Sequence, residues 1–577
     1  MKTRNEFLRY SGYVAAAMAA ITLYLTWKSI FLSYSPLPFW DQWEWIGNDQ
    51  LFGHMFDFHN EHRLAVPNLF FAIDNFIFGG NQAFSIFSIQ VIQIAHLALL
   101  LLIIRSAGVG TTSMIYIAGI GAALLFSPAQ IENFYWGFQV QIVLVYFLAS
   151  LCFWLTTQQP DKWKWDIAAA AAGSAAVFSF AIGLMVLPIA VVIAFSTGQS
   201  RRRLVVLIIS CLVSIFLFFQ GYESPVGHSN PVDGLGHLIE VIYYALVYLG
   251  GPIGLAISRS FIVEIFNFLA DPIQAAKFVG AAGILFSGAL GYFTIVKSRS
   301  ASRYTLLAII ALVLASSLMT ALGRWEFGAQ QALASRYASP VLIFWTSLML
   351  LGWGLLGDVS SEVLRNRFRG GLVAGGFAVS LLLLIDVSSF MNLARHHRDQ
   401  VRGAESSILT QVYDETRLTR VYPSAAKVAE QSELLAARGM SIFGRTESEW
   451  LGSPLRQIAD RSSDTACIGS FDVLTRLEVP LVNGAYSWRA IGWAWDNDGR
   501  RTARQIVLTD ETQTIIGLGF AGEVRVDVAA AFPSINDDRT GWMAHGRSTV
   551  GGSVNAFAIL KNGSACELEH AGSVEIE

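Results

Sequence analysis

The stretch "YVAAAMAAITLYLTWKSIFL", residues 13–32, decides the class of this protein. An apolar run of about 20 residues is long enough for one helix to cross a bilayer, and similar runs recur as far as residue 390. The chain is 53% hydrophobic and 14% charged, whereas soluble domains contain about 25% charged residues. The first run has no small-residue cleavage site, so we interpret it as a retained span. The sequence therefore predicts an α-helical polytopic membrane protein.

Basic residues in short loops predict the orientation, because such loops stay in the cytoplasm. The clearest clusters are Lys2/Arg4/Arg9, Arg201 to Arg203, Lys297/Arg299/Arg303 and Arg365/Arg367/Arg369. When these clusters are placed on the cytoplasmic side, single spans are expected near 11–33, 82–104, 111–128, 139–157, 204–220, 273–296, 304–322, 338–356 and 372–390. Residues 166–197 predict two short spans that meet at "SFAIGLMVLP" (179–188). This gives about 11 transmembrane helices with the C-terminus outside, and twelve with the C-terminus inside is the competing topology.

The segment 237–270 does not fit this count as an ordinary span. Basic clusters flank it on what should be the same side, so another full crossing would break the alternation. The "YLGGPIG" sequence suggests a break at Gly250 to Gly254 and a re-entrant or paired element, which must be covered by other protein at membrane depth.

Acids, arginines, amides and aromatic residues gather in the loops predicted to lie outside. These loops contain "PFWDQWEW" (38–45), "DFHNEHRLAVPNLFFAIDNFIFGGN" (57–81), "SPAQIENFYWGFQVQ" (127–141) and "GRWEFGAQQALASRYASP" (323–340). Aromatic residues are common at any membrane interface, and loop acids are commonly only solvated. The convergence of all these residue types on one face nevertheless predicts a site there. "HNEH" lacks the spacing of a zinc-binding motif, so we predict no metal site, and a divalent metal stays an open alternative.

The chain resembles the GT-C glycosyltransferases, a polytopic class that takes sugar from a polyprenyl-phosphate carrier and transfers it with inversion. The resemblance covers roughly residues 1–390 and rests on "FWDQWEW", "NEHR", "ENFYWGFQ", "SFAIGLMVLP" and "SRY". It implies a bacterial inner-membrane enzyme that acts at the periplasmic face on a cell-envelope glycan such as O-antigen. The expected partners are the polyprenyl-phosphate sugar donor, the glycan acceptor and membrane lipids, and no basic tract indicates nucleic acid.

The resemblance also implies roles for the loop residues. Inverting transfer needs a base for the acceptor hydroxyl, and Asp41 occupies the place of the family's acid, with Glu44 and Glu61 as rivals. Cationic donors for the leaving phosphate are Arg336 and, as further candidates, Arg63 and Arg324. The predicted substrate-binding set is completed by His62, Glu132, Gln139 and Tyr337.

Composition becomes mixed and polar after Met391, which predicts a soluble part. Besides the membrane domain 1–390, we expect a helical linker over 391–460 and a periplasmic β-sandwich over 461–577, similar to carbohydrate-binding modules. Cys467 and Cys566 lie near its first and last strands, so an oxidising periplasm predicts a disulfide. Trp residues in this domain predict either core packing or a sugar platform: Trp488, Trp493, Trp495 and Trp542.

Two other function classes stay open. A transporter or flippase of a lipid-linked glycan should carry charges near the bilayer midplane and show repeated halves, and neither is found in the sequence. A non-catalytic membrane protein that binds polysaccharide through its outer domain would not need Asp41.

Overall fold

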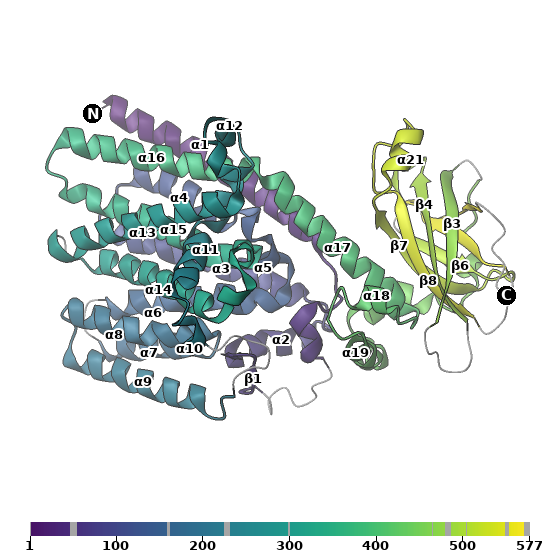
Figure 1. Cartoon of the computed structure of the whole chain (residues 1–577), viewed down its shortest axis with the longest axis horizontal. Helices are drawn as coiled ribbons and strands as arrows, with labels where there is room; N and C mark the ends of the chain where they lie inside the picture. Colours follow the sequence, from purple (N-terminus) through teal and green to yellow (C-terminus); the bar gives the residue numbers. More distant parts are fainter. Residues whose placement is uncertain are drawn as a thin grey trace. The chain divides into compact units, whose positions relative to one another are not determined.

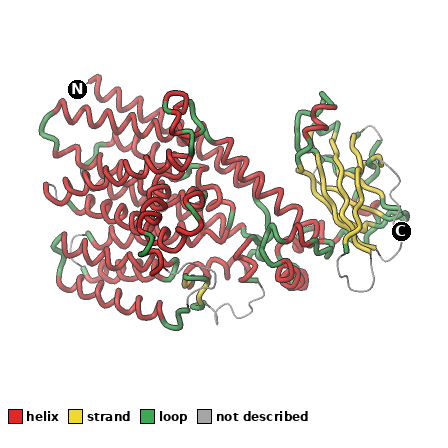
Figure 2. The backbone as a smooth tube through the Cα atoms, in the orientation of Figure 1, coloured by secondary structure: helices red, strands yellow, loops and turns green. Residues whose placement is uncertain are grey.

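The computed structural model describes residues 2–46, 55–158, 162–223, 231–297, 300–463, 466–478, 486–503, 505–548 and 553–570. They divide into two compact units (Figure 1). Unit 1 comprises 1–32, 50–72 and 84–394, and unit 2 comprises 33–49, 73–83 and 395–577. Unit 1 is mostly helical, and the large sheet is confined to the C-terminal part of unit 2 (Figure 2).

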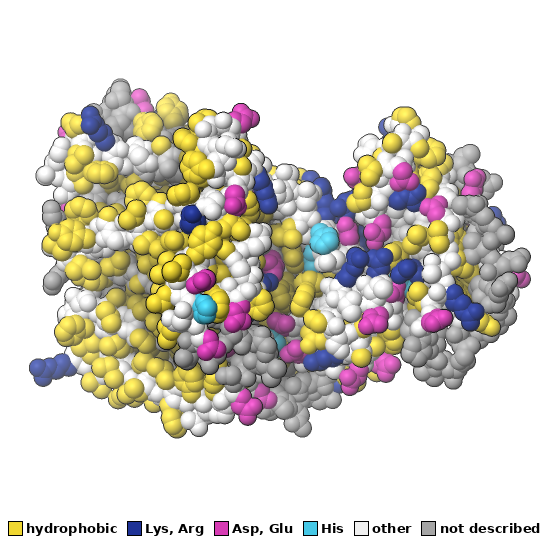
Figure 3. Space-filling view, viewed as in Figure 1, with side chains coloured by type: hydrophobic (Ala, Val, Ile, Leu, Met, Phe, Trp, Pro, Cys, Tyr) yellow, Lys and Arg dark blue, Asp and Glu magenta, His cyan; other side chains and the backbone are white. Residues whose placement is uncertain are grey.

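Unit 1 is a bundle of apolar helices. Among the described residues, ten helices are long and apolar enough to cross a membrane. They are α1 (Lys2–Ser33), α3 (Ala83–Ser106), α4 (Thr111–Leu125, continued to Tyr135), α6 (Val140–Thr156), α9 (Arg201–Phe219), α11 (Leu238–Ser258), α13 (Pro272–Lys297), α14 (Ala301–Arg324), α15 (Ala338–Leu355) and α16 (Glu362–Ile385). Hydrophobic side chains cover the visible face of these helices (Figure 3). The chain is a multi-pass helical membrane protein.

The expected break inside 166–197 is confirmed. Helix α7 (Trp163–Val177) is followed by a 3-10 turn, η4 (Ala181–Met185), and by α8 (Val186–Ser196). Gly183 is required at the turn, because a Cβ there would lie 2.0 Å from the carbonyl oxygen of Ala176.

Arginine contacts identify one end of the bundle. Arg203, at the start of α9, pairs with Asp166 of α7 at 2.6 Å and donates to the carbonyl of Thr156, at the end of α6, at 2.8 Å. Arg303, at the start of α14, pairs with Asp358, just before α16. The hydroxyls of Thr157 and Thr305 are 3.0 Å apart and join these two groups. We call this the basic end. Helices α14 and α16 both run from it to the opposite end.

Helix α11 has both of its ends at the opposite end of the bundle. The ring of His237, just before α11, stacks 3.9 Å from Trp325, just after α14. Arg259, just after α11, pairs at 2.9 Å with Asp386, just after α16. Since α14 and α16 end on the same side, α11 does not pass through the bundle although its length and composition would allow a crossing. The predicted re-entrant character of this segment agrees with the contacts.

The predicted break at Gly250 to Gly254 is wrong, because α11 is helical through these residues and through Pro252. The glycines serve close packing instead. A Cβ on Gly250 would lie 1.9 Å from the carbonyl oxygen of Ala276, and one on Gly254 would lie 2.4 Å from the nitrogen of Ala276. Helices α11 and α13 therefore approach each other backbone to backbone.

Unit 2 joins the first outer loop to the helices that follow residue 394. These are α17 (Val387–Leu409), which begins in unit 1, α18 (Glu415–Leu418) and α19 (Ala425–Ala437). Ser441 donates to the carbonyl of Pro36 at 2.7 Å, and the backbone nitrogen of Trp40 donates to the carbonyl of Val421 at 2.7 Å. The contacts divide the chain after residue 394, and residues 395–460 pack within unit 2 together with the first-loop segments 33–49 and 73–83.

The C-terminal β-domain is one curved sheet of nine strands. They are β3 (Cys467–Leu477), β4 (Tyr486–Asp496), β5 (Arg501–Thr502), β6 (Gln505–Thr509), β7 (Ile515–Glu523), β8 (Gly541–Ser548), β9 (Asn555–Ile559), β10 (Ala565–Glu567) and β11 (Glu569–His570). β10 pairs with β9 at one edge, and β11 pairs in parallel with β3 at the other. One short segment, 565–570, thus joins both edges, so the sheet curls on itself where a two-sheet sandwich was expected.

The predicted disulfide is confirmed: Cys467 of β3 is bonded to Cys566 of β10, with a Cα–Cα distance of 6.2 Å. It ties together the same two edges that the segment 565–570 closes.

Candidate functional site

An arginine and a glutamate from distant loops pair at the end of the bundle opposite the basic end. Arg336 lies in a 3-10 turn, η8 (Ser335–Tyr337), just before α15, and Glu132 lies in α5 (Ile131–Tyr135), between α4 and α6. Nη1 of Arg336 is 3.3 Å from one oxygen of Glu132, and the backbone nitrogen of Arg336 donates to the other oxygen at 3.2 Å. The Arg336 side chain is 33% exposed and that of Glu132 16%. The pair fixes a guanidinium that is still accessible.

Short polar side chains hold the two loops together behind this pair. Asn133 donates to the carbonyl of Arg336 at 2.9 Å and to the hydroxyl of Ser339 at 2.7 Å. Ser335 donates to the carbonyl of Ala129 at 2.8 Å. These supporting residues were not predicted, because only the joining of residues about 200 positions apart gives them a role. Their sequence signal is the small polar residues on either side of Arg336 in "ASRYAS".

A second charged group at this end contains Glu61, His62 and Arg324. Strands β1 (Phe58–His59) and β2 (His62–Arg63) form a tight hairpin, whose turn includes Asn60 at φ 51°. Glu61 lies 3.9 Å from Nη2 of Arg324 and 3.6 Å from Nε2 of His62. The His62 ring packs 3.9 Å from Phe180 and accepts the backbone N–H of Ala181, which ties the hairpin to "SFAIG".

Buried tyrosines connect the two charged groups. Tyr244 donates at 3.1 Å to Gln331, which lies in the loop between Arg324 and Arg336. The Tyr248 ring lies 5.1 Å from Tyr337, and its hydroxyl is 3.4 Å from that of Ser316. The predicted residues Glu61, His62, Glu132, Arg324, Arg336 and Tyr337 therefore belong to one region of unit 1.

Gln139 lies beside this region among aromatic rings. It follows Trp136 and Phe138, whose rings are 5.6 Å apart, and Phe138 stacks on Phe71 at 5.3 Å. Gln139 is buried, and its Oε1 has no hydrogen-bond partner among the residues that the structure describes.

Arg63 was predicted to bind the donor phosphate, and the structure gives it a different role. Its Nε donates to the carbonyl of Phe218 at 2.7 Å, and its other nitrogens donate to the carbonyls of Phe56 and Gln220. Carbonyls at a helix C-terminus lack partners within the helix, and Arg63 satisfies those of α9. Burial lowers the pKa of Arg63 from its usual value. We therefore remove Arg63 from the candidate site.

Asp41 and Glu44 belong to unit 2, on the 3-10 helix η1 (Trp40–Glu44). Trp43 of this helix is fully buried, Asp41 is half-buried and Glu44 is exposed. Glu44 accepts a hydrogen bond from the hydroxyl of Tyr422 at 2.7 Å. Burial and this carboxylate raise the pKa of Tyr422.

The four tryptophans considered as a sugar platform are buried. Trp488 and Trp542 lie in the interior of the curved sheet, and Trp493 and Trp495 pack with Val528 in a smaller cluster. A platform needs exposed ring faces, so core packing accounts for these residues.

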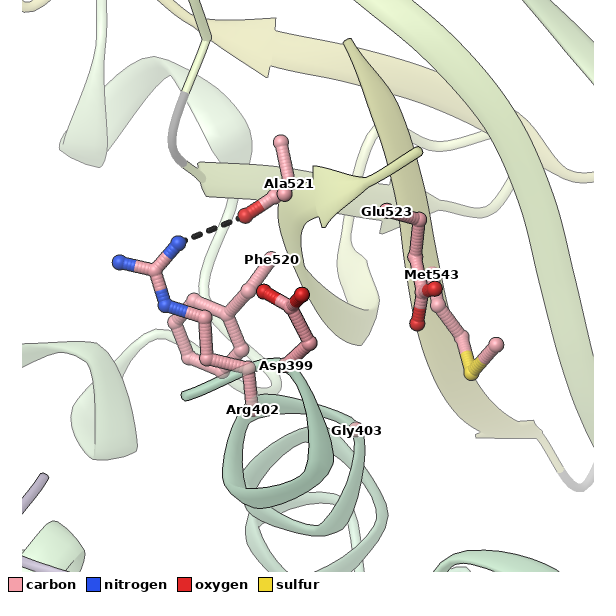
Figure 4. Close-up of a pocket in the computed structure, with 8 residues that line it drawn as sticks. Asp399, Arg402, Gly403, Phe520, Ala521, Glu523 and Met543 are labelled. Carbon is pink, nitrogen blue, oxygen red and sulfur yellow. Dashed lines mark hydrogen bonds between the residues drawn. The ribbon is translucent and has the colours of Figure 1, made fainter. Parts of the chain in front are cut away.

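A pocket in unit 2 lies between α17 and strands β7 and β8 (Figure 4). Asp399 and Glu523 face it, and Arg402 closes one side by donating to the carbonyl of Ala521 at 2.7 Å. Both acids already have partners, because Asp399 pairs with Arg539 and Glu523 lies 3.8 Å from Arg417. The arrangement stabilises the junction of helix and sheet.

No group of three or more His, Cys, Asp or Glu residues in the described part of the chain is arranged to hold a metal ion. The candidate site offers guanidinium, carboxylate, imidazole and amide groups, which suit an anionic ligand with hydroxyl groups.

Comparison with known proteins finds a likeness among solved structures. No protein-family model and no curated protein matches the sequence. Among solved structures, the chain is similar to ArnT from Cupriavidus metallidurans in the apo state. The two are 16% identical, the match covers 60% of this chain and 78% of that one, and the TM-score is 0.28.

Proposed function

We propose that this protein is an inverting glycosyltransferase that moves a sugar from a polyprenyl-phosphate carrier to a cell-envelope glycan at the periplasmic face. The observation that carries the proposal is the accessible guanidinium of Arg336, oriented by Glu132 at the end of the bundle opposite the basic end. A lipid phosphate at the membrane surface meets such a group at headgroup depth, and guanidinium–phosphate pairs are among the strong hydrogen bonds of proteins.

The chemistry follows from these groups. A carboxylate takes the proton of an acceptor hydroxyl while the oxygen attacks the anomeric carbon from the face opposite the phosphate. The bond from the anomeric carbon to the phosphate oxygen breaks, and the polyprenyl phosphate leaves with the electron pair. Arg336, with Arg324 nearby, stabilises the charge that develops on the leaving phosphate.

We assign the base to Asp41, on the short helix η1 of the first outer loop. The resemblance to the GT-C glycosyltransferases supports this choice, because Asp41 occupies the place of the acid that these enzymes carry in that loop. Glu44 and Glu61 are the alternatives, and substitution of each acid in turn decides between them.

Binding of undecaprenyl phosphate, the leaving group itself, tests the phosphate site on the purified full chain. Arg336→Ala should weaken binding about 10- to 100-fold, as expected for a lost hydrogen bond to a charged group. Asp41→Asn should leave the affinity unchanged. The matched control is Arg367→Ala, which removes an exposed arginine of a cluster predicted to be cytoplasmic. Equal affinities for Arg336→Ala and Arg367→Ala would refute the phosphate site.

A further inference from the structure

Two exposed apolar patches flank helix α11. The first precedes and begins the helix, and the second forms the link between α11 and α13, which contains α12 (Ile262–Ile265) and η5 (Asn267–Leu269). Ile239 of the first patch is 82% exposed and Ile265 of the second 70%. The members of the two patches are Leu235, Leu238, Ile239 and Ile242, and then Phe261, Ile265, Phe266 and Phe268.

Both patches lie at the end of the bundle opposite the basic end. The contact of His237 with Trp325 places the first patch there, and the pairing of Arg259 with Asp386 places the second. A helix that crossed the membrane would have carried the patches to opposite faces.

Each patch continues into the side of a spanning helix that faces outward from the bundle. The ring of Phe268 lies 5.5 Å from that of Phe278, on the exposed side of α13. At the other patch, Gly234 lies against Leu322 of α14, near its exposed residues Leu318 and Met319.

We propose that the two patches dip into the outer leaflet at the boundary between headgroups and acyl chains, so that bilayer lipid covers them and holds α11 along the membrane surface. Soluble proteins rarely expose contiguous apolar patches to water. Interfacial membrane segments bury such side chains about 5–10 Å deep, at the boundary between headgroups and acyl chains. Exposed acids beside the patches, Glu240 and Glu264, stay on the water side, which gives the segments their amphipathic character. The inference is independent of the catalytic proposal.

Spin labels on single cysteines test the depth of the patches. Labels replace Ile239 and Ile265, with Leu285 in the middle of α13 as the deep control and Thr512, exposed in unit 2, as the water control. Cys152 and Cys211 are removed, and the Cys467–Cys566 disulfide is kept. In phosphatidylcholine vesicles, collisions with oxygen should exceed collisions with a water-soluble nickel complex at Leu285, and the order should reverse at Thr512. At Ile239 and Ile265 the two rates should be comparable. Labels at Leu238 and Phe261 repeat the test if either variant fails to fold.

The side of the membrane is tested in spheroplasts, where an impermeant reductant should reduce both patch labels. Reduction of only one label, or of neither, would overturn the proposal. So would depths equal to that of Leu285, water accessibility equal to that of Thr512, or shielding from both collision reagents, which would mean that a second copy of the chain covers the patches.

Discussion

Arg63 and Arg336 are the same residue type in loops that the sequence places on the same side, yet their partners give them different roles. Arg63 donates to backbone carbonyls that lie 155 and 157 positions further along the chain. Arg336 meets Glu132, 204 positions away, and stays partly exposed. The sequence could predict the residue types and the loops that carry them. It could not predict which arginine uses its donors to hold the backbone and which stays accessible, because that depends on contacts between residues far apart in the sequence.

Arg63→Lys should lower the thermal stability of the protein without changing its affinity for undecaprenyl phosphate. The compact ammonium group of lysine cannot donate in several directions as the planar guanidinium does, so at least one buried carbonyl of α9 loses its donor. This should lower the free energy of unfolding by about 1–3 kcal/mol. Thermal unfolding in detergent and lipid binding measure the two effects. Arg324→Lys, which alters a partly exposed arginine at the same end, is the control and should unfold close to the wild type. A loss of lipid affinity in Arg63→Lys with unchanged stability would return Arg63 to the binding site.

At the scale of elements, similar glycine and proline signals had different outcomes. Near Gly183 the chain turns, because the backbone of Ala176 leaves no room for a side chain. At Gly250 and Gly254 the helix continues, and the missing side chains admit α13 instead. A glycine in the sequence indicates that another part of the chain packs closely against it, but it does not identify that part. The strands were likewise predictable from alternation, but the closing of the sheet by residues 565–570 depends on pairing between its two edges.

Unit 2 should lose stability as the pH falls below about 6.5. Burial lowers the pKa of His397, in α17, to about 3, with a smaller effect from His396, and burial also lowers that of His545, against the opposing effect of Asp414. The unfolded chain takes up protons near pH 6.5, whereas the folded chain keeps both rings neutral, so stability present at pH 7 is lost as the pH falls toward the folded pKa. His397 alone should cost about 2 kcal/mol by pH 5.

Hydrogen exchange of the buried amides of α17, corrected for the intrinsic rate, measures this loss in the full chain. His397→Phe should remove the His397 share of the pH dependence, since the ring already packs 4.4 Å from Phe39. An unchanged pH dependence in this variant would show that His397 titrates normally.

The disulfide should stabilise the curved sheet by fastening its edges. Its sequence separation is 99, and a closed loop of about that length corresponds to about 4.7 kcal/mol in the chain-entropy model. Cys467→Ser with Cys566→Ser should therefore unfold unit 2 at a markedly lower denaturant concentration, whereas Cys211→Ser, at a free cysteine, should not. Equal denaturant concentrations at the midpoint of unfolding for the two variants would show that the disulfide does not stabilise the sheet.

At the scale of the whole molecule, the class of the protein could be predicted from the apolar runs and the basic loops, and the candidate site from the polar residues of the other loops. The structure adds that α11 keeps both ends on one side of the bundle. Nine of the ten long helices are then left as candidate single crossings among the described residues, beside the shorter pair α7 and α8. The sequence could not divide the first outer loop between two units, because that division arises from packing against residues beyond 394.

The measurement that tests the central claim most directly is mass spectrometry of envelope glycans from a strain lacking this protein, complemented with the wild type or with Asp41→Asn. We predict that the deletion strain lacks one sugar substituent, that the wild type restores it, and that Asp41→Asn restores about 10²- to 10⁴-fold less, as for a removed acid–base group. Loss of the substituent with Glu61→Gln or Glu44→Gln, but not with Asp41→Asn, would move the base to another carboxylate. Identical glycans in the deletion strain and the wild type, or full restoration by all three variants, would contradict the assignment as a glycosyltransferase.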